Sequence, residues 1–444
     1  MSKVFRAYNP NQMMLMPVTL QDWLPEDHLA YFVSDVVDQL DLSTITRRYE
    51  EEKRGYPPYH PRMMVKVLLY AYCIGVPSSR KMARRLWEDV AFRVLAANNT
   101  PDFRTISDFR KDHLEALAGL FVQVLQLCRK AGLIKLGHVS LDGTKVKANA
   151  SKHKAMSYGR MKTEEERLER EVRELLERAE QVDGEEDRRY GTDKAGDELP
   201  EELAYREKRL ARIREAKAAL EEEARKESEV ARSQGKKHKG VPEKKAQRNF
   251  TDPESKIMPV SGGKDFVQAY NAQAAVDSAY QVIGACGVTK ATVDKQQAGP
   301  LVEQLYTNLE EHPRELSADA GYFSEKNVEK VMGLGIEALI PPDKTRHSVS
   351  LPSAPRGRIP KNLSVADRMR RKLRTKRGKR QYALRMKTVE PVFGQIKQGR
   401  GFRQFLLRGL DKVTCEWSLI CTGHNLLKLF GNSSREALGL KSIV

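Results

Sequence analysis

The chain has 444 residues, with 78 Lys and Arg against 60 Asp and Glu, which gives a formal net charge of +18. This length predicts two or three domains, and the positive excess indicates a polyanionic partner, most simply nucleic acid. The five cysteines form no C-x-x-C pair, which argues against a structural zinc site or a disulfide framework. No stretch approaches a membrane span, so we expect a cytoplasmic protein without a membrane partner.

Residues 1–135 are predicted to form a helical N-terminal domain that binds DNA. Apolar residues recur at helical spacing behind Asp27, a candidate N-cap. A nearly all-apolar helix at 61–76 is followed by a basic helix that begins at Ser78 or Ser79. This order resembles a helix-turn-helix and makes Arg84 and Arg85 candidate DNA contacts, although many helical bundles share the pattern.

A second region, residues 136–430, is predicted to be the catalytic domain, followed by a tail at 431–444. It is interrupted at 156–250 by a charged insertion that ends in a basic linker, too polar to pack by itself. Two charged, heptad-like helices within 162–232 predict an antiparallel helical hairpin. We interpret this hairpin as a solvated arm without chemistry.

With the insertion removed, the order of elements predicts the fold class. A first strand ends in Asp142, residues 266–289 read as a hairpin, and two later strands alternate with helices. The pattern is α/β, in the order of a ribonuclease H-like mixed sheet. In such a sheet the first and fourth strands are neighbours, so Asp142 and Asp319, each at the end of its strand, should lie side by side.

A third acid is expected from the closing helix. Between 344 and 408 the chain has twenty Lys and Arg but only Asp367 and Glu390 as acids. Glu390 is therefore either a carboxylate of a binding site or an ion-pair partner of Lys387 or Arg385, and composition leaves both readings open.

Three carboxylates suit phosphodiester chemistry. Mg²⁺ prefers oxygen ligands, and two ions can activate the attacking oxygen and stabilise the leaving one. We expect Asp142 to bridge two Mg²⁺ ions (Mn²⁺ as a substitute) and Asp319 and Glu390 to hold one each. The sequence contains no H-E-x-x-H pair and no G-x-x-x-x-G-K-[ST] loop, which disfavours a zinc hydrolase and an ATPase.

The chain resembles a known family, the DDE transposases of bacterial insertion sequences. The resemblance is to the insertion-sequence-1182-like group within the insertion-sequence 4/5 type in particular. The segments that carry the resemblance are "VSLDGTKVKANAS", "DPESKIM", "YNAQAAVD", "SADAGYFSEKN" and "VEPVFGQIK…GFRQFLLRGLDKV…HNLLKL". It implies a ribonuclease H-like core, action on double-stranded DNA as a homodimer, association with the nucleoid, and an acidic triad of Asp142, Asp319 and Glu390.

Related transposases carry a Tyr-x2-Arg-x3-Glu-x6-Lys signature around the last acid. Here Tyr382, Arg385, Glu390 and Lys397 keep that order, but four residues separate the Arg from the Glu. On a continuous helix the extra residue turns Arg385 by about 100° from its expected face. Pro391 places Glu390 at a helix start or a kink.

Several lysines complete the predicted DNA contacts. Lys145 and Lys147 follow Asp142 at alternating positions, and Lys387 competes with Arg385 for a phosphate. The basic tract at 368–381 is the best candidate for binding the DNA backbone.

The function expected from these features is that of a transposase. It would bind the terminal inverted repeats of its element, cleave there in a Mg²⁺-dependent reaction and transfer the strand to target DNA. Two alternatives stay open: a structure-directed nuclease or resolvase of the same fold, and a DNA-binding protein that does not cleave.

Overall fold

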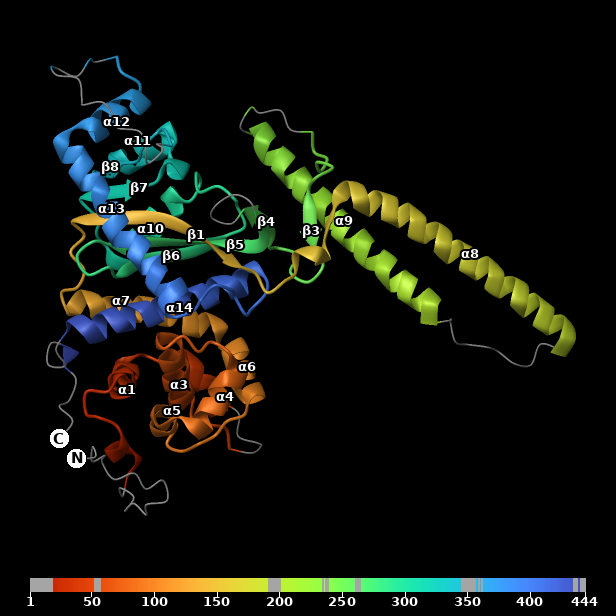
Figure 1. Ribbon diagram of the computed structural model, residues 1–444, viewed down its shortest axis with the longest axis horizontal. Helices are drawn as coiled ribbons and strands as arrows, with labels where there is room; N and C mark the ends of the chain where they lie inside the picture. The colour runs from red at the N-terminus through yellow and green to blue at the C-terminus, as the bar shows by residue number, and fades with distance from the viewer. Residues whose placement is uncertain are drawn as a thin grey trace, which may run out of the picture.

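A computed structural model of the chain describes residues 19–51, 57–190, 201–233, 235, 239–259, 265–344, 357, 360, 362–433, 438 and 439. Most of the tail predicted at 431–444, and part of the basic linker that ends the insertion, lie outside these residues. The described part is a mixed α/β structure with a helical N-terminal region, as the sequence predicts (Figure 1). None of the described helices has the length and apolar character to cross a membrane.

The N-terminal region is built from short helices. They are α1 (Leu29–Gln39), α2 (Ser43–Glu51), α3 (Pro61–Cys73), α4 (Ser79–Glu88), α5 (Val90–Leu95), α6 (Phe103–Asp112) and α7 (Leu114–Lys130). The cap of α1 is His28, whose imidazole accepts a hydrogen bond from the Ala30 amide, so the expectation that Asp27 caps this helix is wrong. Ser78 occupies the N-cap position of α4.

The predicted helix-turn-helix is not the way these helices pack. The basic helix α4 makes its main contacts with α5 and α6, whereas the buried helix α3 packs on α1 and on the C-terminal helix α14 (Leu410–Asn432). The two helices of a helix-turn-helix pack on each other. The arrangement is closer to the helical bundle that the sequence left as the alternative.

One hydrophobic core runs through both predicted domains. Helices α7 and α14 lie side by side between the N-terminal helices and the sheet (Figure 1). Apolar side chains of α1, α3, α7, α14 and the sheet belong to a single cluster of buried residues. The domain boundary predicted at residue 135 therefore falls within one continuous hydrophobic core.

The main sheet is mixed, with six strands. They are β1 (His138–Lys147), β4 (Lys256–Pro259), β5 (Phe266–Asp277), β6 (Ile283–Thr289), β7 (Glu315–Ala318) and β8 (Glu337–Leu339). Strand β1 pairs antiparallel with β5 and parallel with β7, which in turn pairs parallel with β8. Strands β5 and β6 form the predicted hairpin. The two strands expected to be neighbours, β1 and β7, do lie side by side.

Helices cover this sheet and complete its connections. Helix α10 (Ala298–Leu309) packs on β5 and β6, and α11 (Glu325–Gly333) packs on β8. Helix α12 (Val365–Arg374) leads into α13 (Lys376–Gly394), which crosses the sheet and contacts β1, β5, β7 and β8 (Figure 1).

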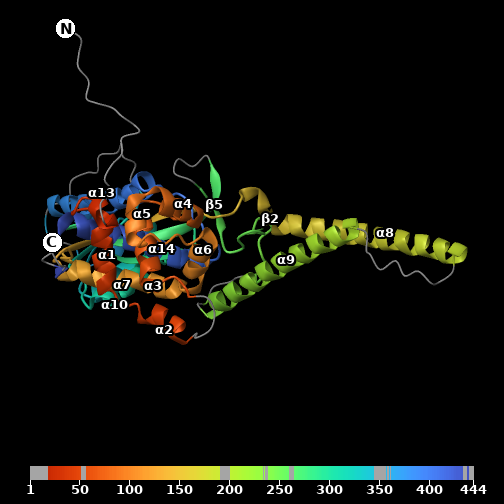
Figure 2. The same ribbon diagram turned by 90° about the horizontal axis from the view of Figure 1, so that it is seen from below.

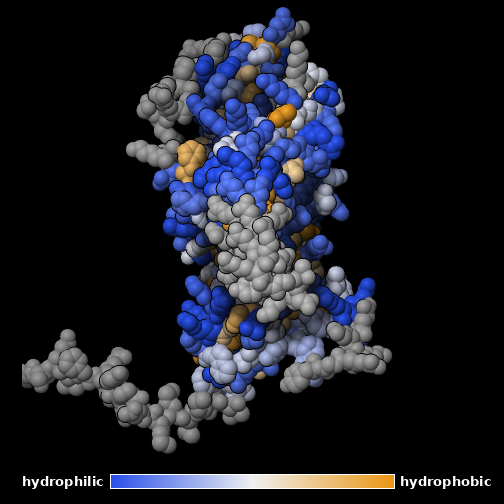
Figure 3. Space-filling model, turned by 90° about the vertical axis from the view of Figure 1, so that its right-hand side faces the viewer, coloured by the Kyte–Doolittle hydropathy of each residue, from blue (hydrophilic) through white to orange (hydrophobic). Residues whose placement is uncertain are grey.

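The insertion forms an arm that projects from the core. Helices α8 (Tyr158–Tyr190) and α9 (Glu201–Ser233) make the predicted hairpin, and strands β2 (Ala155–Ser157) and β3 (Gln247–Asn249) pair at its base (Figures 1 and 2). A small apolar cluster of its own, which includes Met161, Leu168 and Ile213, holds the two helices together. The face of the molecule on this side is largely hydrophilic (Figure 3).

The base of the arm is tied to the sheet by an ionic cluster. Glu223 of α9 lies 3.0 Å from Arg248, 3.4 Å from Lys256 at the start of β4 and 3.9 Å from Lys290 just after β6. These cations lower the pKa of the Glu223 carboxyl, against the effect of burial. The arm is therefore fixed to the edge of the sheet at a partly buried position.

Candidate active site

Asp142 and Asp319 meet because their strands are parallel neighbours. Leu141 pairs with Ala318, so the residues that follow them, Asp142 and Asp319, are acids at the same level of the sheet. Asp142 lies within β1, which continues to Lys147, so the expectation that it ends its strand is wrong. The side chain of Asp142 is only 18% exposed. Asp319 directly follows β7 and caps the short helix that comes next, with its Oδ1 accepting a hydrogen bond of 2.9 Å from the Gly321 amide.

Helix α13 brings a basic and an acidic side chain to the same place. Arg385 Nη1 donates a hydrogen bond of 2.7 Å to Asp142 Oδ2, and Arg385 Nη2 lies 3.7 Å from Glu390 Oε1. The extra residue between Arg385 and Glu390 does not carry the arginine away from the site. Tyr382, one turn before it, is partly buried and interacts with the same guanidinium.

Glu390 lies inside α13 and not at a helix start, and Pro391 is accommodated within the helix. A proline at this position removes one backbone donor, and the helix changes four residues later to a π-helical turn over Gln395–Gly399. This turn carries Lys397. The Glu390 side chain itself is about half exposed.

The pKa of Asp142 is raised to about 6. Burial is the main cause, because it disfavours the charged carboxylate, and the nearby charge of Asp319 adds to it. Arg385 opposes both effects. Arg385 and Lys145 both lie near Asp142 and Asp319 and offset part of their negative charge.

Lys397 and the two lysines after Asp142 take different positions. Lys397 Nζ donates to Thr144 Oγ1 at 2.7 Å and to the Lys145 carbonyl at 2.8 Å, so it holds strand β1 just after Asp142. Lys145 Nζ donates to the Thr292 carbonyl at 3.0 Å, and burial lowers its pKa against the attraction of nearby acids. Lys147 is exposed.

The other predicted DNA contacts lie outside this cluster. Lys387 is exposed on α13 and does not replace Arg385 beside the acids. Arg84 and Arg85 are exposed on α4, where Arg85 also pairs with Asp89 at 3.1 Å. Trp87 on the same helix is 71% exposed. These side chains form a basic and aromatic surface separate from the acids.

A fourth acid, Asp294, belongs to the site and was missed by the sequence analysis. Its Oδ1 accepts hydrogen bonds from Asn271 Nδ2 at 2.6 Å and Gln273 Nε2 at 2.7 Å. Gln273 also accepts from the Tyr322 hydroxyl. The available signal was its position in the turn after β6, because Asp319 also lies directly after a strand.

Two glycines make room for this arrangement. A Cβ at Gly143 would clash with the Gln273 amide and lie 2.8 Å from Asp294 Oδ1. A Cβ at Gly321 would lie 3.0 Å from Asp319 Oδ1 and 3.5 Å from Asp294 Oδ2. Carboxylate oxygens of Asp319 and Asp294 therefore lie close together beside Gly321.

The chemistry of the donors fits a hard divalent cation, but their arrangement is not yet a ligand set. The acids supply the oxygen ligands that Mg²⁺ prefers, and Asn271 Oδ1 is buried without a hydrogen-bond partner. Yet no group of three His, Cys, Asp or Glu is placed to hold a metal ion in the part of the chain that the structure describes. Arg385 lies within ion-pair distance of both Asp142 and Glu390.

Comparisons with known families bear on this site. Residues 18–112 match the family model described as Transposase domain (DUF772), and residues 356–430, which include α13 and most of α14, match the model described as Transposase DDE domain. Neither the curated proteins nor the solved structures contain a match to the chain. The two matches support a DDE transposase family and an enzyme that cleaves or transfers DNA.

Proposed function

We propose that this protein is a transposase with a ribonuclease H-like core, which binds the terminal inverted repeats of an insertion sequence, cleaves the DNA there and transfers the strand to target DNA. The observation that carries the proposal is the meeting of Asp142 and Asp319 at one edge of the sheet, with Glu390 linked to them through Arg385. Asp142, Asp319 and Glu390 are the proposed catalytic carboxylates.

A divalent cation, Mg²⁺ or Mn²⁺, would supply activation of the attacking oxygen and stabilisation of the leaving oxygen when bound. Asp142 and Asp319 would hold it, with Glu390 as the third ligand. Because Arg385 pairs with Asp142 and approaches Glu390, it partly neutralises these carboxylates before the cation arrives and would have to give way to it.

The chain's own residues give the reaction its setting. Lys397 fixes the strand that carries Asp142 through Thr144 and the Lys145 carbonyl. Asp294, held by two amides, supports the space beside Asp319. Phosphate contacts by Lys147, Lys387, the exposed side of α4 and the basic tract at 368–381 would give affinity and salt dependence with little sequence information.

The test uses a labelled duplex that carries the inverted repeats bordering the reading frame, with Mg²⁺ and the full chain. The parent protein should cleave at the repeat and produce a joined product with a second duplex. A gel in which cleavage occurs without joining would instead identify the structure-directed nuclease. Cleavage by the Asp142→Ala protein at the parent rate would refute the site.

One observation favours a second candidate, a DNA-binding protein that does not cut. In the described residues the acids are not gathered into a three-ligand group, and Arg385 fills the gap. This candidate predicts tight, salt-sensitive binding of the duplex without turnover in Mg²⁺ or Mn²⁺, and without any metal-induced stabilisation of the protein.

The proposed form of action is a homodimer on DNA. Size-exclusion chromatography with multi-angle light scattering, with and without the inverted-repeat duplex, would show whether DNA brings two copies together. A complex that contains one copy per DNA end and never two ends would contradict this part of the proposal.

A further inference from the structure

The base of the arm contains a cavity of about 450 Å³ that the catalytic site does not use. One wall is the face of α9 that carries Tyr205, Lys208 and Arg212, and the other includes Lys154 and Arg160. No acidic residue lines the cavity. A pocket with cations on both walls fits a polyanion.

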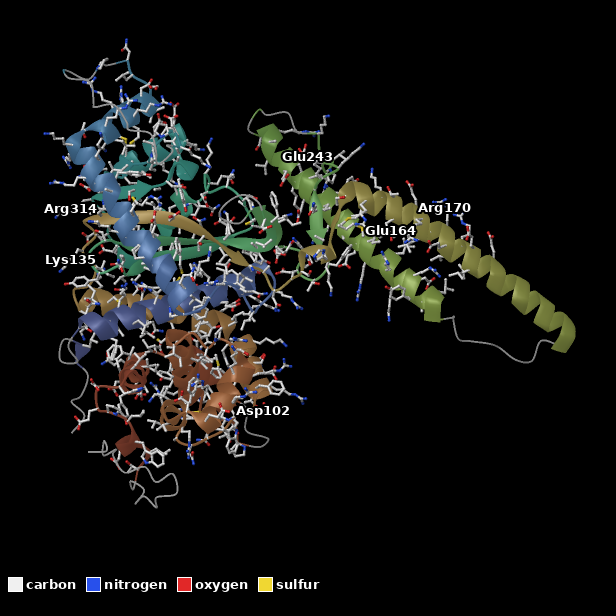
Figure 4. All side chains as sticks on the ribbon, viewed as in Figure 1. Asp102, Lys135, Glu164, Arg170, Glu243 and Arg314 are labelled. Atoms are coloured by element: carbon white, nitrogen blue, oxygen red, sulfur yellow. The ribbon has the colours of Figure 1, made fainter. Side chains whose placement is uncertain are left out.

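The charges of the arm divide into two groups. Several cations pair across the two helices: Arg209 with Glu164 at 2.8 Å, Arg206 with Glu171 at 2.9 Å and Lys217 with Glu165 at 2.6 Å. In Figure 4, Glu164 lies on the side of α8 that faces α9, whereas Arg170 points away from it. These ion pairs hold the two helices together, and they require no role for the hairpin beyond that of a solvated arm.

The cations of the cavity do not follow this pattern. Among the carboxylates of the described residues, none lies within ion-pair distance of Lys154, Arg160, Lys208 or Arg212. All four side chains are exposed. Glu164, which pairs with Arg209, offsets part of the charge of Arg160; the like charges that remain repel one another, and an anion bound between them would relieve that repulsion.

Helical spacing places three polar side chains of the α9 wall in a row. Tyr205, Lys208 and Arg212 are three and four residues apart, so they share one face of α9. Tyr205 is 65% exposed to solvent, which is a high exposure for an aromatic side chain. Hydroxyl, ammonium and guanidinium groups are the side chains that contact DNA phosphates.

The chain leads from the strand that carries Asp142 to the wall of the cavity. Strand β1 ends at Lys147, and residues 149–157 lead directly to the cavity wall. This link is held by Asn149, whose Nδ2 donates to the Leu406 carbonyl at 2.7 Å and whose carbonyl accepts from Arg408 Nε at 2.9 Å. A duplex that lies on the acids and follows β1 outward would reach the cavity.

We propose that this basic groove, formed by Lys154, Arg160, Tyr205, Lys208 and Arg212, binds the phosphate backbone of double-stranded DNA beside the catalytic site. The inference rests on the proposed function, because it takes DNA as the substrate. It assigns the arm a role in holding DNA, in place of the solvated arm without chemistry expected from the sequence.

The test compares two charge-matched double variants of the same helix in the full-length protein. Lys208→Gln with Arg212→Gln removes two charges from the groove, and Arg225→Gln with Lys226→Gln removes two charges that pair locally with Glu222. Gln has a helix propensity close to that of Lys and Arg, so α9 should be retained in both. Circular dichroism checks that retention.

The measurement is the affinity for a roughly 40-base-pair duplex of mixed sequence, in EDTA, as a function of salt. If both groove cations contact phosphates, the slope of log K against log salt should be less steep by about 1.8, because each lost contact contributes about 0.9. Over a tenfold rise in salt, the affinity of the parent should therefore fall about 60-fold more than that of the groove variant. The matched control should keep the parent slope.

Three results would overturn the proposal. Equal slopes for the groove variant and the parent would show that these side chains do not contact DNA. An equal loss in both variants would show that only the total charge matters. A change in self-association without a change in DNA binding would assign the groove to an acidic surface of a second copy. If instead the parent itself fails to bind the duplex, the proposed function fails first.

Discussion

The core and the arm both carry charged residues, but they use them in opposite ways. In the core, Asp142 and Arg385 are largely buried and share a site with Asp319, so each charge alters the pKa of its neighbour. In the arm, Glu164 and Arg209 pair near solvent, where such a pair contributes little to stability. The comparison teaches that position, more than the number of charges, decides where chemistry and binding reside.

The largest effect is expected from the acids of the core. Asp142→Ala or Asp319→Ala should lower Mg²⁺-dependent cleavage by roughly 10³-fold or more, because the proposed cation loses a ligand. Glu303→Gln is the matched control, since Glu303 is an acid on α10 that pairs only with Lys330 at the surface. Initial rates on the inverted-repeat duplex give the comparison, and similar rates for Asp142→Ala and the control would contradict the difference between core and surface.

A second prediction concerns stability and pH without metal. The folded pKa of Asp142, about 6 against an ordinary 3.8, means that the folded protein binds this proton more tightly than the unfolded chain. The parent should therefore lose up to about 3 kcal/mol of stability as the pH rises from about 4 to about 6. Asp142→Asn does not titrate, so its stability should exceed that of the parent above pH 6 by more than it does at pH 4.

Denaturant unfolding in EDTA at several pH values measures this gap. Glu164→Gln in the arm serves as the contrast. Arg167 and other nearby cations lower the Glu164 pKa, so its charge favours the folded state and its replacement should give no stabilisation at neutral pH. An Asp142→Asn protein whose advantage does not grow with pH would show that burial does not raise this pKa.

The next effect in size is expected at Asp294. Asp294→Ala removes the acceptor of the Asn271 and Gln273 amides and should destabilise the protein by about 1–3 kcal/mol, because buried donors are left unpaired. Asp294→Asn keeps an oxygen for both donors and should cost less. Thermal unfolding of the two variants tests this order, and an equal cost for both would indicate that the negative charge matters more than the hydrogen bonds.

The smallest effect is expected from Arg385. Because its guanidinium occupies the position between Asp142 and Glu390, Arg385→Ala should increase Mn²⁺ affinity by about tenfold, equivalent to about 1.4 kcal/mol. Lys387→Ala, an exposed cation on the same helix, should leave the affinity nearly unchanged. Electron paramagnetic resonance of free Mn²⁺ measures both. Weaker binding in Arg385→Ala would mean that the arginine positions the acids for the metal.

The sequence predicted the order of the sheet because hydrophobic runs and turns are local signals. The hairpin of β5 and β6 and the helical hairpin of the insertion follow from such signals, whereas the placement of β1 beside β7 followed from the strand order of a ribonuclease H-like sheet. The short strands β2, β3 and β4 were missed because they lie in or beside the charged insertion, where no apolar run between helices marks a strand; β7 and β8 are as short but lie between predicted helices.

The site was less accessible to sequence reasoning, because it depends on how side chains meet across the fold. The pairing of Arg385 with Asp142 joins residues 243 positions apart. The helical spacing of Arg385 and Glu390 indicated separation, yet a long, flexible guanidinium still reaches both acids. Asp294 gave only a weak signal, since its role comes from Asn271 and Gln273 on the neighbouring strand.

The single core shared by the N-terminal helices and the sheet has a mechanical consequence. Buried side chains of α3 pack on α14, and α14 packs on β6. In the described residues, α4 and the strands that carry the acids therefore belong to one continuous core. The DNA segment bound by Arg84 and Trp87 would lie at a fixed distance from the segment that reaches Asp142. The site of cutting would then be measured from the gripped sequence by the dimensions of the fold itself.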